Sequence, residues 1–178
     1  MYGKVAWTLV RLAEFTNVKK IGVISDTHIP IRAESVPEEV YEIFKDVDLI
    51  LHAGDVVDAK VIKELEKIAP VVAVKGNMDQ FELAEKVIVN INNKFKIGVM
   101  HGYGARDNLV NTVKNEFKDV DCIVFGHSHS AFNEVQDNVL MFNPGSACDT
   151  VFTQINSVGI LHVNEKIRGE IHKLGGEK

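Results

Sequence analysis

Residues 21–28 read Ile-Gly-Val-Ile-Ser-Asp-Thr-His, an apolar run that ends in two side chains able to bind a metal ion. The same pattern recurs in four further segments. In α/β sheets, ligand-binding groups lie just beyond the carboxyl ends of the strands. Five occurrences therefore predict one shared sheet edge that carries a binuclear metal site. The runs and their ligands are 21–25 with Asp26 and His28, 49–53 with Asp55, 71–75 with Asn77, 95–100 with His101, and 122–125 with His127 and His129.

Each of these residues has an ordinary structural interpretation when it is taken alone. A lone Asp26 is typical of a turn or a helix N-cap, and a lone His129 of a polar loop. Seven ligand-type residues at five strand ends are not explained in that way. Glycines 54, 76, 102 and 126 support the metal interpretation, because glycine lets the backbone turn tightly and pass close to an ion or a phosphate.

Length and composition indicate a single compact domain. The chain has 178 residues, of which 46% are apolar, and this is enough to close a hydrophobic core. The net charge of −5 argues against an extensive nucleic-acid-binding surface, which needs clustered Lys and Arg. Two isolated cysteines, Cys122 and Cys148, indicate a reducing compartment without a disulfide framework. We therefore expect a cytoplasmic protein.

Residues 1–19 are expected to form an extension ahead of a single domain at 20–178. Apolar residues at 5, 9, 12 and 15 have helical spacing and favour a short amphipathic helix over residues 3–16. Three roles fit the extension: packing on the body, contacts in a homo-oligomer, or a loosely ordered tail, of which we favour the first. Arg11 and Glu14 end its apolar run too early for a signal peptide. No stretch approaches the length of a membrane helix, so we expect no membrane association.

The segments between the ligand-bearing runs have helical periodicity. Helices are predicted over residues 36–44, 59–68 and 106–117, the second beginning after Asp58 as its cap and ending before Pro70. After His129 the pattern changes to strands at 132–136, 139–142, 158–163 and 167–173, which we interpret as a β-meander. The expected fold class is α/β, with a two-sheet β-sandwich flanked by helices.

The polar segments together resemble the calcineurin-like metallophosphoesterases, and most closely the compact phosphodiesterase branch of that superfamily, to which the retromer scaffold subunit is related. The resemblance covers about residues 20–173, and its motifs are specific when taken as a set. The motifs that carry it are Asp26-Thr27-His28, Gly54-Asp55, Gly76-Asn77-Met78-Asp79, His101-Gly102 and Gly126-His127-Ser128-His129.

The resemblance implies a division of the ligands between two divalent transition-metal ions. It also implies that Asp55, Asn77 and His101 are catalytic and that a metal-bound hydroxide is the nucleophile. Nitrogen and oxygen ligands of these types suit Mn²⁺, Ni²⁺, Fe or Zn²⁺, and we expect Mn²⁺ first. By this resemblance, one ion takes Asp26, His28 and His129, the other takes Asn77, His101 and His127, and Asp55 bridges them.

Two departures from the superfamily pattern bear on the substrate. Met78 stands where larger phosphatases of the superfamily carry a histidine that protonates the leaving group, and a thioether cannot do this. Asp79 is a substitute acid or, as we prefer, an N-cap. Residues 147–156 hold no basic residue, so Arg32 and Arg106 are the nearest candidates for binding substrate. His52 is expected to support its neighbours rather than bind metal.

The expected function is therefore that of a phosphodiesterase that uses a binuclear metal centre on small or nucleotide-like phosphodiesters. Two alternatives stay open. One is a protein-interaction scaffold of the retromer type with a vestigial metal site. The other is a phosphomonoesterase, which Met78 disfavours because an alkoxide leaving group benefits from a general acid. Retention of all seven ligands favours the enzyme over the scaffold.

Overall fold

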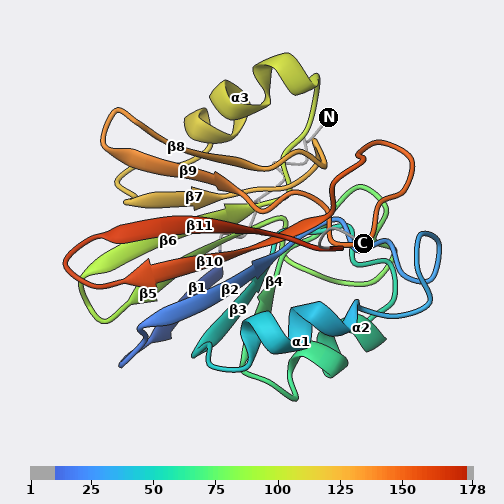
Figure 1. The fold of residues 1–178 in the computed structure, drawn as a ribbon. Helices are drawn as coiled ribbons and strands as arrows, with labels where there is room; N and C mark the ends of the chain where they lie inside the picture. The colour runs from blue at the N-terminus through green and yellow to red at the C-terminus, as the bar shows by residue number, and fades with distance from the viewer. Residues whose placement is uncertain (1–10, 176–178) are drawn as a thin grey trace, which may run out of the picture.

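The computed structural model describes residues 11–175 as two β-sheets packed face to face, with helices on both outer surfaces (Figure 1). This confirms the predicted two-sheet sandwich. The five-stranded sheet has the order β11 (Ile167–Lys173), β10 (Ser157–Val163), β2 (Lys20–Ile24), β3 (Leu49–His52) and β4 (Val71–Ala73). The six-stranded sheet has the order β1 (Arg11–Phe15), β5 (Lys86–Ile91), β6 (Phe95–Met100), β7 (Cys122–Val124), β9 (Val139–Asn143) and β8 (Phe132–Gln136).

The main hydrophobic core fills the space between the two sheets. In β5, Val87, Val89 and Ile91 are buried while the residues between them are partly exposed, so one face of this strand points inward. In β3 every residue is buried, since a helical layer covers the outer face of its sheet. Burial on both faces is typical of parallel strands that carry helices.

Helices close the two outer faces (Figure 1). Helices α1 (Glu38–Phe44) and α2 (Lys60–Leu65) pack on the five-stranded sheet. Helix α3 (Leu109–Asn115) follows the 3₁₀ turn η1 (Arg106–Asn108) and packs on the six-stranded sheet. A Cβ atom at Gly22 would lie 3.0 Å from the Phe44 ring, so glycine lets α1 approach β2 closely. The three helices lie where the sequence predicts them, although each is shorter than its predicted range.

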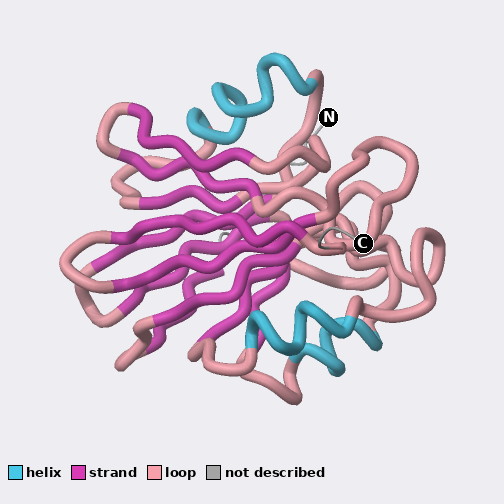
Figure 2. The backbone as a smooth tube through the Cα atoms, in the orientation of Figure 1, coloured by secondary structure: helices cyan, strands magenta, loops and turns pink. Residues whose placement is uncertain are grey.

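The strand directions bring the ligand-bearing loops to one edge of the molecule. Strands β2, β3 and β4 run parallel to one another, as do β6, β7 and β9. Figure 2 shows the loops gathered at one end of the strands. The two sheets meet there through a hydrogen bond from the His127 N–H to Asp26 Oδ2, 3.2 Å long. The predicted shared edge is therefore formed by strand ends from both sheets.

The structure corrects the prediction at the N-terminus and adds a strand that the sequence analysis did not find. Residues 11–15 form β1, which pairs in parallel with β5, where a helix over 3–16 was expected; residues 3–10 lie outside the described residues. Helical spacing and a short edge strand look alike over five residues, and the pairing with β5 decides between them. Strand β5 was missed: its burial alternates in the structure, but the run Val87-Ile88-Val89 hides that alternation in the sequence.

The predicted β-meander is also corrected, because its four strands form two hairpins in different sheets. Strands β8 and β9 pair in the six-stranded sheet, and β10 and β11 pair in the five-stranded sheet. The connection from Asn143 to Ser157 crosses between the sheets along the edge that holds the ligands. This crossing brings a long loop over the candidate site. Among the described residues, no helix has the length and apolar character needed to cross a membrane.

Candidate metal centre

The backbone at the site adopts an unusual conformation. Five of the seven predicted ligands have positive φ angles: Asp26 (52°), His28 (46°), Asp55 (55°), His127 (66°) and His129 (59°). This left-handed region is uncommon for residues with a side chain, and it costs free energy that the surrounding structure must supply. Sharp turns of this kind aim each side chain back over the end of its strand. Local strain is thus concentrated where the ligands converge.

Two glycines are required for the same convergence. A Cβ atom at Gly76 would lie 2.1 Å from Asp55 Oδ1, and one at Gly126 would lie 2.0 Å from Ser25 Oγ. Neither position has room for any side chain, because the obstructing atoms belong to the buried site itself. The Gly-Asn and Gly-His pairs of the sequence therefore reflect close backbone approach, as expected for glycines beside a ligand site.

The first group of ligands surrounds Asp26. Its Oδ1 atom lies 3.3 Å from His129 Nε2 and 3.9 Å from His28 Nε2. The other carboxylate oxygen, Oδ2, accepts hydrogen bonds from Ser25 Oγ at 2.5 Å and from the His127 N–H. One oxygen is thus held by the protein while the other faces the two imidazoles. The structure brings together the three residues predicted for one ion.

The second group surrounds His101. Its Nδ1–H donates to the Ala53 carbonyl at 2.8 Å, which fixes the ring and turns Nε2 toward the cluster. That Nε2 lies 3.1 Å from Asn77 Oδ1 and 3.4 Å from Asp55 Oδ2. Asp55 Oδ2 also lies 3.4 Å from Nε2 of His28, a member of the first group. Asp55 therefore lies between the two groups, and so does Asp26, whose Oδ1 is 3.9 Å from His101 Nε2.

These side chains fit bound divalent ions. Asp26 Oδ1 and His28 Nε2 are buried and have no hydrogen-bond partner among the described residues. An unpaired buried polar atom is costly, and coordination would satisfy both atoms. Ligand atoms about 2.0–2.2 Å from one ion lie roughly 3 Å apart. The separations of 3.3 and 3.9 Å around Asp26 Oδ1, and of 3.1 and 3.4 Å around His101 Nε2, lie near that value.

His127 is the predicted ligand that the structure draws least into the cluster. Its ring packs edge-on against His101, with centroids 5.3 Å apart. Its Nε2, however, lies 3.1 Å from the Gly104 carbonyl oxygen, which would accept a hydrogen bond. His127 belongs to neither of the two groups of buried His and Asp side chains. An Nε2–H that donates to the Gly104 carbonyl would leave Nδ1 unprotonated and available to a metal ion.

Two further polar residues hold the loops rather than facing the cluster. His52 accepts a hydrogen bond from the Gly54 N–H at Nδ1, and its Nε2 lies 3.1 Å from Thr27 Oγ1, so it ties β3 to the loop after β2. Asp79 accepts N–H groups from Asp55, Gly76 and Val57 at 3.1, 2.7 and 2.7 Å. The preferred N-cap role of Asp79 is wrong, because no helix follows it in the described structure and its carboxylate is used by these loops.

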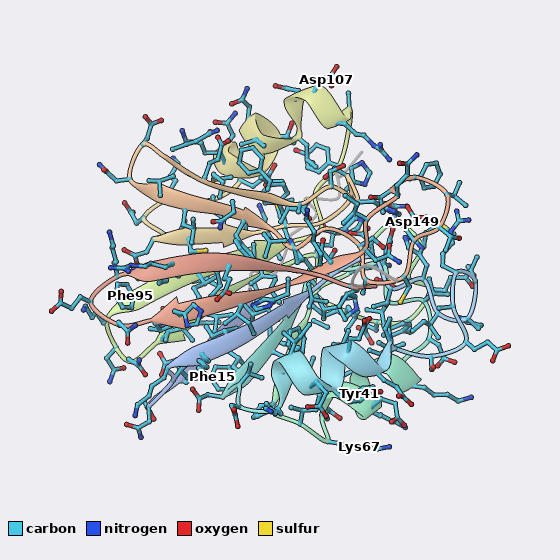
Figure 3. The ribbon with its side chains drawn as sticks, viewed as in Figure 1. Phe15, Tyr41, Lys67, Phe95, Asp107 and Asp149 are labelled. Atoms are coloured by element: carbon cyan, nitrogen blue, oxygen red, sulfur yellow. The ribbon has the colours of Figure 1, made fainter. Side chains whose placement is uncertain are left out.

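Asp149 is a site residue that the sequence analysis missed. Its Oδ2 lies 2.6 Å from His129 Nδ1, and it accepts the N–H groups of Val151 and Phe152. A carboxylate behind a histidine fixes the ring orientation and raises its basicity as a ligand. No motif marks Asp149; the only signal is an acid in the loop after Asn143, and its approach to His129 depends on the crossing between sheets. Figure 3 labels it among the clustered loops.

The cluster favours positive charge. Burial lowers the pKa of His101, but the hydrogen bond with Asp55 and the charges of Asp26 and Asp55 outweigh burial and raise it to about 9. Burial also lowers the pKa of His129, but the hydrogen bonds and charges of Asp26 and Asp149 outweigh burial and raise it. A site that stabilises buried imidazolium is electrostatically suited to a divalent cation.

A pocket opens directly above the cluster. It has a volume of about 570 Å³, and the exposed Met78 side chain forms part of its wall. The Met78 N–H donates to Asp55 Oδ1 at 2.8 Å, so the backbone of this residue positions the ligand while its side chain faces the pocket. Arg32 and Arg106, far apart in the sequence, both line the pocket, as does Phe152.

A helix-flanked sandwich with a buried Asp/His cluster at its edge is the arrangement expected of a metal-dependent phosphoesterase. The calcineurin-like phosphoesterase superfamily domain matches residues 20–166, and the chain belongs to this superfamily. It is 40% identical over 154 residues to a probable metallophosphoesterase of Methanocaldococcus jannaschii, covering 85% of this chain and 79% of that protein.

Solved structures show the same fold. A structure described as a novel archaeal phosphodiesterase is 30% identical, has a TM-score of 0.69, and is matched over 87% of this chain and 99% of that chain. Wild-type Vps29 from Entamoeba histolytica, complexed with zinc, is 25% identical with a TM-score of 0.68, over 88% of this chain and 99% of that chain. The predicted resemblance is confirmed at the level of the superfamily and its compact members.

Proposed function

We propose that the protein is a binuclear metal-dependent phosphodiesterase acting on small or nucleotide-like substrates. The observation that carries this proposal is the position of Asp55 Oδ2, at the same 3.4 Å distance from a histidine of each ligand group. A carboxylate between two groups suits a bridge between two ions. The superfamily match and the archaeal phosphodiesterase neighbour support the reaction class.

The proposed ligands are those the sequence predicts: Asp26, His28, Asp55, Asn77, His101, His127 and His129. Two divalent ions bound there, Mn²⁺ being our first expectation, supply an activated water and positive charge for the phosphoryl oxygens. The protein's own contribution is orientation. The Ala53 carbonyl and Asp149 fix the rings of His101 and His129, and the Met78 N–H holds Asp55.

We attribute the proposed specificity for diesters to one residue of the pocket wall, Met78. Met78 is 43% exposed and faces this pocket, and its thioether has no proton to donate. A phenolic leaving group departs from a diester without being protonated. The alkoxide leaving group of an alkyl monoester, by contrast, benefits from a general acid. Two buried free cysteines agree with the proposed cytoplasmic location.

The test is hydrolysis of bis(p-nitrophenyl) phosphate by protein freed of metal and then reconstituted with Mn²⁺. We expect activity with Mn²⁺, none with a chelator, and loss of nearly all activity in His127→Ala. Elemental analysis of the same samples should give two ions per chain. Fully metallated protein that is inert on a panel of diesters would contradict the proposal.

The second candidate is a protein-interaction scaffold, which the Vps29 neighbour supports. Three apolar side chains are exposed: Ile31, which lines the pocket, and Val151 and Ile155, which belong to the loop between β9 and β10. A scaffold that has lost catalysis would bind metal and remain inert on every ester. Comparison of metal content with turnover in the same preparation therefore distinguishes the two functions.

A further inference from the structure

The pocket extends well beyond the space that a scissile phosphate needs. Its volume of about 570 Å³ lies within the range of sites that enclose whole small-molecule ligands. One wall is the metal-ligand cluster. Another wall is formed by Arg32, Arg106 and Phe152, of which the first and last lie in loops and Arg106 begins η1. A substrate that fills the pocket therefore meets both walls.

The second wall is built around an aromatic ring. The guanidinium carbon of Arg32 lies 5.4 Å from the centroid of the Phe152 ring, and that of Arg106 lies 5.6 Å from it. The ring itself meets His129 edge-on, with centroids 5.5 Å apart and planes at 90°. Cation–π contacts of this length hold a guanidinium in place. Phe152 thus positions two cations next to the candidate metal centre.

The two arginines differ in how far their charge is compensated. Arg32 Nε lies 4.0 Å from Asp149 Oδ1, a carboxylate that also serves His129. Within residues 11–175, no carboxylate lies within 4.0 Å of a guanidinium nitrogen of Arg106. Arg106 is exposed where it lines the pocket, so its guanidinium is open to an anionic group of a bound substrate. One singly charged diester, already held by the ions, leaves Arg106 without a partner.

We propose that Arg106, stacked on Phe152 beside Arg32, binds a second phosphate group on the arm of the substrate that is not the leaving group. The substrate class is then a phosphodiester of a nucleotide that carries an additional phosphate. A planar guanidinium binds phosphate through paired hydrogen bonds. Neither the apolar side chains of the pocket nor the metal ligands can provide such bonds. This inference rests on the proposed function.

The kinetic test compares two diesters with the same leaving group and the same scissile phosphate. These are the p-nitrophenyl ester of thymidine 5′-phosphate and the same ester carrying a 3′-phosphate. With the Mn²⁺-loaded protein, we expect kcat/KM to be about tenfold or more higher for the doubly phosphorylated ester, the gain expected of charge-assisted hydrogen bonds. Arg106→Met should reduce this ratio to about 1.

Arg168→Met is the matched control, because Arg168 is exposed on β11, at the turn that joins it to β10. It should keep the wild-type ratio. A wild-type ratio near 1, or an Arg106→Met variant that slows both esters by the same factor, would overturn the proposal.

A binding measurement decides the inference independently of turnover. Calorimetry on the Mn²⁺-loaded protein should give a Kd for thymidine 3′,5′-bisphosphate about tenfold or more below that for thymidine 5′-phosphate, and Arg106→Met should remove the difference. If neither ester is hydrolysed, the proposed phosphodiesterase function fails while this comparison still applies. Equal affinities for the two nucleotides in the wild type would refute the second-phosphate site.

Discussion

At the scale of single residues, the site depends on groups that bind no metal themselves. Asp149 holds Nδ1 of His129, while backbone N–H groups of Val151 and Phe152 hold Asp149. Burial raises the pKa of Asp149, but these hydrogen bonds and the charge of His129 outweigh it, so the pKa is lowered and the carboxylate stays ionised. A charged support behind a ligand is the arrangement that increases metal affinity.

We therefore predict that Asp149→Asn lowers the affinity for Mn²⁺ by about 10–100-fold, the usual cost of losing such a support. Titration of the metal-free protein with Mn²⁺ measures this. Asp107→Asn is the control, since Asp107 is exposed in η1, and Figure 3 shows it well apart from Asp149. Equal affinity in wild type and Asp149→Asn would contradict the role given to this carboxylate.

Met78 allows a prediction about leaving groups. Its exposed side chain lines the pocket and cannot act as an acid, so rates should fall steeply as the pKa of the leaving group rises. Met78→His should improve hydrolysis of alkyl monoesters, but by less than the roughly 10²–10⁴-fold of a positioned general acid, because no neighbouring group orients the new ring.

Met78→Leu is the matched control, because it keeps the size and lacks an acid. The measurement is a plot of log kcat/KM against leaving-group pKa for all three proteins. A flat plot, with the wild type already favouring alkyl monoesters, would show that another group supplies the proton.

At the scale of secondary-structure elements, His52 joins β3 to the loop that follows β2. Its Nδ1 accepts the Gly54 N–H, so protonation there would break a buried hydrogen bond. Burial lowers the pKa of His52 to about 4 from an ordinary value of 6.5. The folded protein therefore binds fewer protons than the unfolded chain between these pH values, and stability falls as the pH falls through this window.

For the metal-free protein, we predict that the lowered pKa of His52 alone reduces the unfolding free energy by on the order of 3 kcal/mol as the pH falls from 6.5 to 4. Urea denaturation at several pH values should show a shallower loss for His52→Gln than for wild type. His101 does not obscure this window, because its raised pKa removes stability only as the pH rises above 6.5. Identical pH dependence in the two proteins would refute the assignment.

Strand β1 is an edge strand whose Ala13 and Phe15 pack against the core between the sheets. A chain lacking residues 1–15 should fold and bind Mn²⁺ as the full chain does, but with an unfolding free energy lower by about 2 kcal/mol, the value of one partly buried aromatic side chain. Phe15→Ala in the full chain should account for much of that loss. Unchanged stability on truncation would mean that β1 adds nothing to the domain at 20–178.

The elements differ in how well the sequence alone predicts them. Runs such as 49–53 are mostly apolar and are followed closely by a ligand-type residue, so β3 and its neighbours can be predicted from one short segment each. The structure of residues 11–15 is set by pairing with β5, more than seventy residues away, and no local pattern contains that information. The same reason explains why the sequence analysis missed Asp149 and did not connect Arg32 with Arg106 through Phe152. Segments that are distant in the sequence meet at both places.

At the scale of the whole molecule, the candidate metal centre joins the two sheets. Asp26, Asp55 and Asn77 follow strands of the five-stranded sheet, whereas His101 and His129 follow strands of the six-stranded sheet. Ions held by both sets would connect the two layers at one edge. Separation of the sheets during unfolding would then require release of the ions, so binding and global stability are linked.

Mn²⁺ at a hundredfold excess over its Kd should therefore raise the unfolding free energy by about 2.7 kcal/mol for each site filled. Calorimetric scans with Mn²⁺ and with a chelator measure the corresponding rise in Tm. Asp55→Asn should lose most of this rise, because an amide cannot supply the charge shared between the two ligand groups. Asp58→Asn should keep it, since the partners of the Asp58 side chain in residues 11–175 are the N–H and Nζ of Lys60 at the start of α2. A Tm that does not respond to saturating Mn²⁺, or one that rises equally in Asp55→Asn, would mean that the cluster does not join the sheets through metal.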